Sequence, residues 1–129
     1  MINPRVEAWE EKLDQILRRT DRELEKEFGS RYPIHPARPA DGVTANPQQD
    51  GLFRIYASFT PGFGSDLGKG YALDIDVASL EKIDPKFRQE VENFAVERIR
   101  HGLQEAFPGK GMEVKKDGRV WKITGDLSL

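Results

Sequence analysis

The stretch FTPGFGSDLGKGYALDID, residues 59–76, places glycines around a lysine in the way that phosphate-binding loops do. A Walker A loop needs the pattern G-x-x-x-x-G-K-[ST] between a strand and a helix, because backbone amides and a helix N-terminus hold the phosphates together. Here Gly68 and Lys69 follow Phe63 where the first glycine is required, and Gly70 takes the place of the hydroxyl residue. A strand, and not a helix, is expected to follow. The sequence therefore does not favour a nucleotide site.

The preferred interpretation of residues 61–70 is the flexible turn of a β-hairpin. A second interpretation is a loop that contacts a partner protein, because Phe63 and Leu67 are apolar side chains on a segment that should be exposed. These two residues are therefore candidate interface residues.

Two carboxylates, Asp74 and Asp76, share one face of an expected strand, which is the spacing of an Asp-x-Asp metal or acid–base pair. The strand register described below places Arg54 opposite Asp76, so a surface ion pair is the favoured interpretation. The alternative is a small ligand-binding protein or enzyme. Its cleft would lie between the sheet and the preceding proline-rich connector, with Tyr32 and His35 joining the two aspartates.

Cysteine is absent, which excludes disulfides, thiolate nucleophiles, iron–sulfur clusters and Cys-type zinc sites. The two histidines, His35 and His101, stand outside the H-x-x-x-H and H-E-x-x-H spacings of metal centres. His101 has a glutamate four residues to either side on an expected helix, yet general-base catalysis also needs a pocket. We therefore predict no catalytic residue, no metal site and no cofactor, and an enzyme is not the favoured class.

The C-terminal residues 110–129 carry more basic than acidic side chains, unlike the rest of the chain. Binding of single-stranded nucleic acid would need aromatic platforms beside these cations on an exposed sheet face. The alternation of the last strand instead places Trp121 on the apolar face with Ile123. Weak nucleic-acid binding through this hairpin is therefore a less favoured alternative, resting on Lys110, Lys115, Lys116, Arg119 and Lys122.

At 129 residues, with 37% hydrophobic and 33% charged residues, the chain suits one domain built from amphipathic elements. We expect a single α+β domain over residues 1–129. The chain has no apolar run of the roughly 18 residues that a membrane span requires. Its start, MINPRVEAWEEK, lacks the apolar core of a signal peptide. The formal net charge of −2 argues against a polyanion as partner. A cytoplasmic protein is predicted.

Apolar residues at helical spacing predict a first helix over about residues 4–28, with Asn3 as its cap and Gly29 at its end. Four prolines between residues 30 and 50 remove backbone donors and predict an extended connector over this segment. The pair Asp84–Pro85 begins a second amphipathic helix, which ends before the Pro-Gly pair that follows Phe107.

From Gly51 the apolar period changes to two, which predicts strands at residues 53–59 and 71–77. If these strands pair in antiparallel fashion with both apolar sets on one face, Ile55 lies opposite Ile75. The same register places Arg54 opposite Asp76 and Tyr56 opposite Asp74.

The dipeptide Asp117–Gly118 between two alternating runs is a strong hairpin signal. A two-residue turn there places Val114 opposite Trp121 and Met112 opposite Ile123. The complete order is then α-β-β-α-β-β, a circular permutation of the ferredoxin-like β-α-β-β-α-β arrangement. It predicts a two-layer sandwich in which a four-stranded antiparallel sheet carries both helices on one face. The match concerns topology alone.

A helix of about 25 residues is roughly 38 Å long, whereas a seven-residue strand spans roughly 23 Å. The first helix should therefore overhang the sheet, although its apolar stripe continues to Trp9 near its start. A symmetric dimer is a common way to cover such a patch. We predict a non-catalytic protein-interaction module that forms a homodimer, with Trp9 and Leu13 at the interface.

Overall fold

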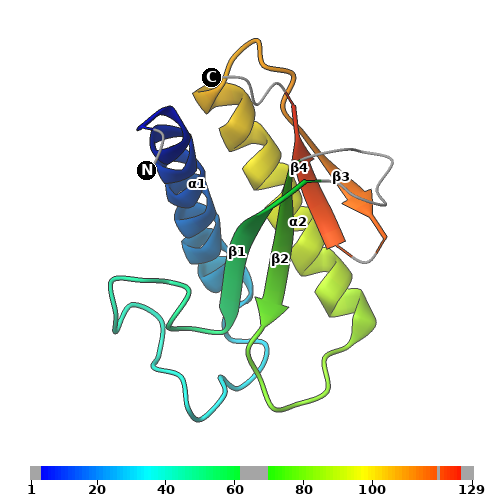
Figure 1. The fold of residues 1–129 in the computed structure, drawn as a ribbon. Coiled ribbons are helices and arrows are strands. Elements are labelled where there is room, and N and C mark those ends of the chain that lie inside the picture. Colours follow the sequence, from blue (N-terminus) through cyan, green and yellow to red (C-terminus); the bar gives the residue numbers. More distant parts are fainter. Residues whose placement is uncertain (1–3, 62–69, 119, 126–129) are drawn as a thin grey trace.

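The computed structural model describes residues 4–61, 70–118 and 120–125. Its elements follow the expected α-β-β-α-β-β order, as Figure 1 shows. This order confirms the predicted α+β class. None of the helices in the described part of the chain is long and apolar enough to cross a membrane. The elements are α1 (Pro4–Phe28), β1 (Phe53–Thr60), β2 (Gly70–Val77), α2 (Pro85–Ala106), β3 (Glu113–Asp117) and β4 (Val120–Thr124).

The four strands form one antiparallel sheet in the order β1-β2-β4-β3. Strands β2 and β3 flank β4, so they run parallel to each other, and α2 joins them. This is the split βαβ unit that the permuted ferredoxin-like order requires. Both helices cover one face of the sheet, and the connector between α1 and β1 lies at one end of the molecule (Figure 1). Strands β1 and β3 are the two edges.

The register of β1 and β2 is the predicted one. Ile55 pairs with Ile75, and Arg54 pairs with Asp76. Ile55 and Ile75 are 1% and 8% exposed, respectively. A slip of one residue would turn the apolar set of one strand to the outer face, so burial of one face fixes this register.

The register of β3 and β4 differs from the predicted one by two residues. Val114, and not Met112, lies opposite Ile123, and pairing extends to Asp117 opposite Val120. Asp117 therefore belongs to the strand and is not a turn residue. A slip of two residues leaves every side chain on the same face, so the alternation of apolar residues cannot distinguish the two registers.

The start of α1 is covered within a single chain. Trp9 stacks on Tyr71 of β2 and on Phe107 just after α2, with ring centroids 4.8 and 5.2 Å apart. Trp9 is 9% exposed and Leu13 is 4% exposed. The expectation that the overhanging end of α1 lacks cover is therefore wrong, because aromatic side chains from β2 and from the end of α2 close it. The overhang no longer gives a reason to place these two residues at a dimer interface.

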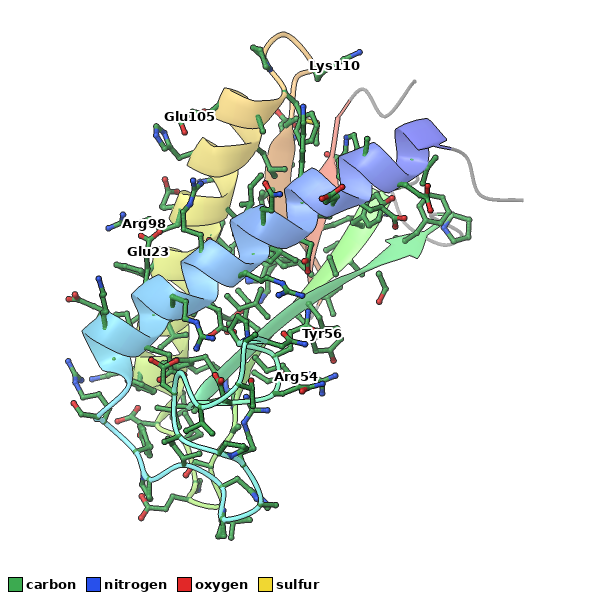
Figure 2. The ribbon with its side chains drawn as sticks, turned by 90° about the vertical axis from the view of Figure 1, so that its left-hand side faces the viewer. Glu23, Arg54, Tyr56, Arg98, Glu105 and Lys110 are labelled. Atoms are coloured by element: carbon green, nitrogen blue, oxygen red, sulfur yellow. The ribbon has the colours of Figure 1, made fainter. Side chains whose placement is uncertain are left out.

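Helices α1 and α2 pack closely where Gly102 faces Ile16. A Cβ atom at Gly102 would lie 3.0 Å from Cγ2 of Ile16, so the missing side chain lets the two helices approach. Beside this contact, Glu23 of α1 and Arg98 of α2 form an ion pair of 2.8 Å (Figure 2). Together these contacts fix α1 next to α2.

Candidate functional site

Strand β1 is an edge of the sheet, and the backbone groups of Phe53 and Ile55 point away from β2, as their hydrogen bonds show. The backbone N–H of Phe53 donates to the Glu25 carboxylate (2.9 Å), and its carbonyl accepts from Arg38 (3.2 Å). The carbonyl of Ile55 accepts from the side-chain amide of Gln48 (3.2 Å). Side chains from α1 and from the connector therefore cover the first half of this edge.

The second half of the edge lies beyond these contacts. Backbone direction alternates along an antiparallel strand, so Ala57 and Phe59 also direct their N–H and C=O groups outward. Among the residues that the structure describes, the connector's hydrogen bonds to β1 end at Ile55. Figure 2 looks onto this edge, with the connector over the start of β1 and its end clear of the connector. An edge of this kind presents unpaired donors and acceptors to another chain.

The side chains of the open edge are a large aromatic and a small aliphatic one. Phe59 is 57% exposed although it lies on the helix face of the sheet, where its ring meets the Tyr71 ring edge to face at 5.7 Å. Ala57 lies two residues earlier on the same face. Beside it is a hollow of about 140 Å³, whose walls include Leu13 and Leu17 of α1. The open edge thus carries a protruding aromatic side chain next to a small apolar hollow.

The rim of this hollow is acidic. Glu10 accepts a hydrogen bond from the Tyr71 hydroxyl (3.3 Å), and Asp14 pairs with Arg18 (2.8 Å). Burial, and then the neighbouring Glu10 carboxylate, raise the pKa of Tyr71. The hydroxyl therefore remains a donor at neutral pH and helps to hold the Glu10 carboxylate at the rim.

The predicted interface residues fall into two groups. Leu13 lines the hollow but is itself buried, and Trp9 belongs to the core near the start of α1. Phe63 and Leu67 fall in residues 62–69, which lie outside the described residues. The interface that these four residues were expected to form therefore stays a prediction.

Tyr32 and His35 fasten the start of the connector to the body of the fold. The Tyr32 ring packs on Phe87 (4.8 Å), and its hydroxyl accepts from the backbone N–H of Asp84 (3.0 Å), the N-cap of α2. The backbone N–H of His35 donates to the carbonyl of Ala78 (2.8 Å), and its ring Nδ1 accepts from a backbone N–H two residues on (2.9 Å). These contacts anchor the connector.

Asp74 and Asp76 lie on the outer face of the sheet, opposite Tyr56 and Arg54. Arg54 stacks over the Tyr56 ring at 4.5 Å, on the side of β1 that faces away from α1 (Figure 2). Burial, and then the neighbouring Asp74, raise the pKa of Asp76. The two predicted pairs of pocket residues therefore occupy different places, the start of the connector and the outer sheet face. Within the described ranges, no group of three or more His, Asp or Glu side chains could hold a metal ion.

The basic β3–β4 hairpin turns its tryptophan toward α2, as predicted. The Trp121 indole N–H donates to the Glu92 carboxylate of α2 (2.7 Å). Lys116 lies 3.4 Å from the same carboxylate and over the Trp121 ring at 5.0 Å. Lys122 is only 2% exposed, and Arg119 lies outside the described residues. Trp121 therefore offers no stacking platform for nucleic acid on the outer sheet face.

A cluster of charged side chains fixes the connector against α1, and no periodic pattern in the sequence points to it. Asp50 is fully buried and accepts hydrogen bonds from Arg22 (2.9 Å) and from the backbone and hydroxyl of Thr44 (2.9 and 2.8 Å). Burial opposes the ionisation of Asp50, but the hydrogen bonds from Thr44 and then Arg22 lower its pKa. Arg22 also binds Asp41, so one side chain of α1 gathers two carboxylates from the connector.

Arg38 fixes the course of the connector through hydrogen bonds to backbone carbonyls. Its guanidinium group donates at distances of 2.6–3.2 Å to four backbone carbonyls, those of Gln48, Asp50, Gly51 and Phe53. A planar group with five donors suits this task. The end of the connector and the start of β1 are thereby gathered around one side chain.

Asp21 is the exception in this region. Its side chain is 1% exposed, and neither carboxylate oxygen has a hydrogen-bond partner within the described part of the chain. Burial, and then the Glu25 carboxylate, raise the pKa of Asp21 to about 8, against the opposing effect of Arg22 and Arg38. Burial also raises the pKa of Glu25. At neutral pH the buried Asp21 therefore carries a proton.

The geometry defines a two-layer α+β protein with an open sheet edge, and sequence comparison assigns it to a family. Residues 4–125 match the model of a family described as "Uncharacterised protein", so the chain belongs to that family. It is similar to an "Uncharacterized protein" of Borreliella burgdorferi (strain ATCC 35210 / DSM 4680 / CIP 102532 / B31). The two are 42% identical over 102 residues, which cover 79% of this chain and 80% of the relative. No solved structure matches the chain.

Proposed function

We propose that the protein is a non-catalytic interaction module that forms a homodimer by pairing two copies of β1. The observation that carries this proposal is the open edge at Ala57 and Phe59, where an exposed aromatic side chain stands next to a small hollow. Unpaired edges are templates for the addition of another strand. A cytoplasmic location is part of the proposal, since a chain without cysteine suits a reducing compartment.

The backbone of β1 favours one register for this pairing. Antiparallel strands exchange hydrogen bonds where residues with outward backbone groups lie opposite one another. Ala57 opposite Phe59 of the second copy meets this condition. A two-fold axis beside Ser58 then also places Phe59 of the first copy opposite Ala57 of the second. Each of these two residue pairs can form two backbone hydrogen bonds. Both copies use the same surface, so the assembly stops at a dimer.

The side chains suit the same register. Residues directly opposite each other share a face of the sheet, with Cβ atoms about 5 Å apart. Phe59 of the second copy would therefore lie over Ala57, beside the hollow next to Leu17. Burial of the exposed half of each Phe59 would contribute about 1–1.5 kcal/mol per copy. The two-fold axis is perpendicular to the sheet, so the helices of both copies stay on one face of a continuous sheet.

The charges near the edge set the strength of the contact. Glu10 and Asp14 of each copy lie beside the open edge, and the two-fold axis brings these acidic flanks toward each other. Like charges repel unless salt screens them. The ion pair between Asp14 and Arg18 offsets part of this repulsion. We expect a weak dimer whose Kd falls as the salt concentration rises.

Analytical ultracentrifugation over a concentration series tests the proposal. The mass is expected to rise from 14.7 kDa toward twice that value as the protein concentration increases. A mass of 14.7 kDa at every concentration up to the millimolar range contradicts the proposal.

Two variants at the edge locate the contact. Phe59→Glu places a charge in the pairing site, and Ala57→Pro removes an outward N–H that β2 does not use. Both variants should be monomeric while keeping the melting temperature close to that of the parent. Leu80→Glu is the matched control, because Leu80 is also an exposed apolar residue, at 71%, but lies outside β1. If Phe59→Glu remains dimeric, the contact lies elsewhere.

A further inference from the structure

We infer that residues 30–50 form a removable cover over the first half of the β1 edge, and that loss of the proton on Asp21 opens this cover. The opening is inferred from the contacts of the connector alone, whereas its consequence for strand pairing rests on the proposed function. In the closed form, Arg38 and Gln48 of the connector occupy the outward carbonyls of Phe53 and Ile55.

Polar contacts hold the cover in place. Between residues 30 and 50, only Pro47 and Asp50 are buried, and Val43 is 68% exposed. Tyr32 and Ile34 pack against the core and fasten the start of the cover. Residues 38–50 are attached mainly by the contacts that Arg22 makes with connector carboxylates and that Arg38 makes with backbone carbonyls. Segments with few buried apolar contacts open at a small fraction of the global unfolding free energy. Residues 38–50 of the cover can therefore open while its anchored start, the sheet and the helices stay folded.

The charged groups that face Asp21 come from α1 and from the cover. Helix α1 contributes Glu25 and Arg22, and the cover contributes Arg38 and Asp41. Both arginines keep their charge over the whole pH range considered. The two carboxylates disfavour a further negative charge, and no hydrogen bond from the described residues stabilises one on Asp21. In the closed form Asp21 is therefore stable as the neutral acid, whereas opening gives its carboxylate access to water.

Ionisation of Asp21 favours the open form. The pKa of Asp21 is about 8 in the closed form and 3.8 for a solvated aspartate, so the closed form binds one more proton between these values. The equilibrium constant for opening should therefore rise with pH, by up to tenfold per pH unit. The raised pKa of Glu25 acts in the same direction. The lowered pKa of Asp50 acts in the opposite direction, but only below its ordinary value of 3.8.

Opening would lengthen the edge that a second copy can pair with. Phe53 and Ile55 would then join Ala57 and Phe59 as residues with free outward groups. The two-fold pairing can shift so that Phe53 lies opposite Phe59, and Ile55 opposite Ala57, of the second copy. The number of paired positions then doubles. The dimer is expected to be tighter at pH 8 than at pH 6.

Hydrogen–deuterium exchange of the full chain, at a concentration where it is monomeric, tests the opening. After correction for the intrinsic exchange rate, protection of peptides spanning 40–53 should fall by up to tenfold per pH unit between pH 6 and pH 8. Peptides within β2 should keep their protection. Asp21→Asn should remove most of the pH dependence and leave only the contribution of Glu25. His101→Gln, on the exposed side of α2 and outside the cover, is the matched control and should retain the dependence.

Protection that does not change with pH, or an unchanged dependence in Asp21→Asn, overturns the inference. If Asp21→Asn fails to fold, the carboxyl titration of Asp21 followed by NMR decides the question, and a midpoint near 3.8 overturns it. Sedimentation at pH 6 and pH 8 then tests the consequence for pairing. Tighter association at pH 8 supports both proposals. A cover that opens in a chain that is monomeric at both pH values supports the cover and contradicts only the proposed dimer.

Discussion

Trp9 of α1 and Tyr71 of β2 stack nearly parallel, with an interplanar angle of 15° and ring centroids 4.8 Å apart. Phe107 packs against Trp9 as well, so three aromatic rings from three parts of the chain close one end of the core. Aromatic pairs of this kind contribute stability beyond the area that they bury. Trp9 therefore anchors the first turns of α1 to the sheet.

Replacement of Trp9 by alanine tests this role. Trp9→Ala should lower the free energy of unfolding by about 3–5 kcal/mol, because it leaves a cavity between two rings. Urea denaturation followed by circular dichroism measures the loss, and Trp9→Phe should lose less. A loss under about 1 kcal/mol, with a lower mass in solution, would return Trp9 to a dimer interface.

The close approach of the helices at Gly102 predicts an overpacking effect. Gly102→Val should destabilise the protein by about 1–3 kcal/mol, since its side chain meets Ile16. Ile16→Ala should be less harmful in the Gly102→Val background than in the parent, and a double-mutant cycle by thermal denaturation measures this coupling. Gln104→Val, on the exposed side of the same helix, is the control. Additive losses would show that these two positions do not share a contact.

Because the Asp50 carboxylate is buried and hydrogen-bonded, the free energy of unfolding should fall at acidic pH. Asp50→Asn should lower the free energy of unfolding by about 2–4 kcal/mol at pH 7, because it weakens three hydrogen bonds around a buried group. The folded-state pKa of Asp50 lies below the ordinary 3.8, so its contribution is present above pH 3.8 and is lost as the pH falls through the folded value. Denaturation of parent and variant from pH 3 to pH 8 should show the difference shrinking only at the acid end. Asp41→Asn, at an exposed partner of Arg22, should cost less.

Nucleotides and metals should leave the stability unchanged. The glycine loop lacks the Walker A pattern, so adding ATP with magnesium, or zinc, should not raise the melting temperature. Differential scanning fluorimetry over a ligand series measures this. A saturable rise that disappears in Lys69→Ala would show that residues 61–70 do bind a phosphate.

Alternation of apolar residues was sufficient to predict the β1–β2 hairpin but not the register of the second hairpin. Between β1 and β2 the wrong face would bury Asp76 in place of Ile75, so burial alone selects the register. Between β3 and β4 the choice lay between two registers with the same faces. Contacts that follow from the fold, such as Lys116 over Trp121, accompany the observed one.

The open edge and the charged cluster could not be predicted from the sequence. Strand order decides which strand is an edge, and local patterns do not encode strand order. Asp50 and Arg22 are far apart in the sequence and meet only because the connector folds back on α1. The burial of Trp9 was not predicted for a similar reason. A comparison of helix and strand lengths takes no account of side chains such as Phe107, which pack against the overhanging part of α1.

Arg38 donates hydrogen bonds to main-chain carbonyls, a group that every residue type has. Exposed positions nearby, such as Val43, can therefore change their side chains while the backbone keeps its course. The condition is that position 38 is arginine and that Asp41, Thr44, Asn46 and Gln48 keep their side-chain hydrogen bonds. Lysine, a point charge on a flexible stem, cannot present a planar fork of donors to four carbonyls. The exposed side chain of Val43 is thus free to vary without altering the shape of the loop, whereas Gly42, at a φ of +85°, favours glycine.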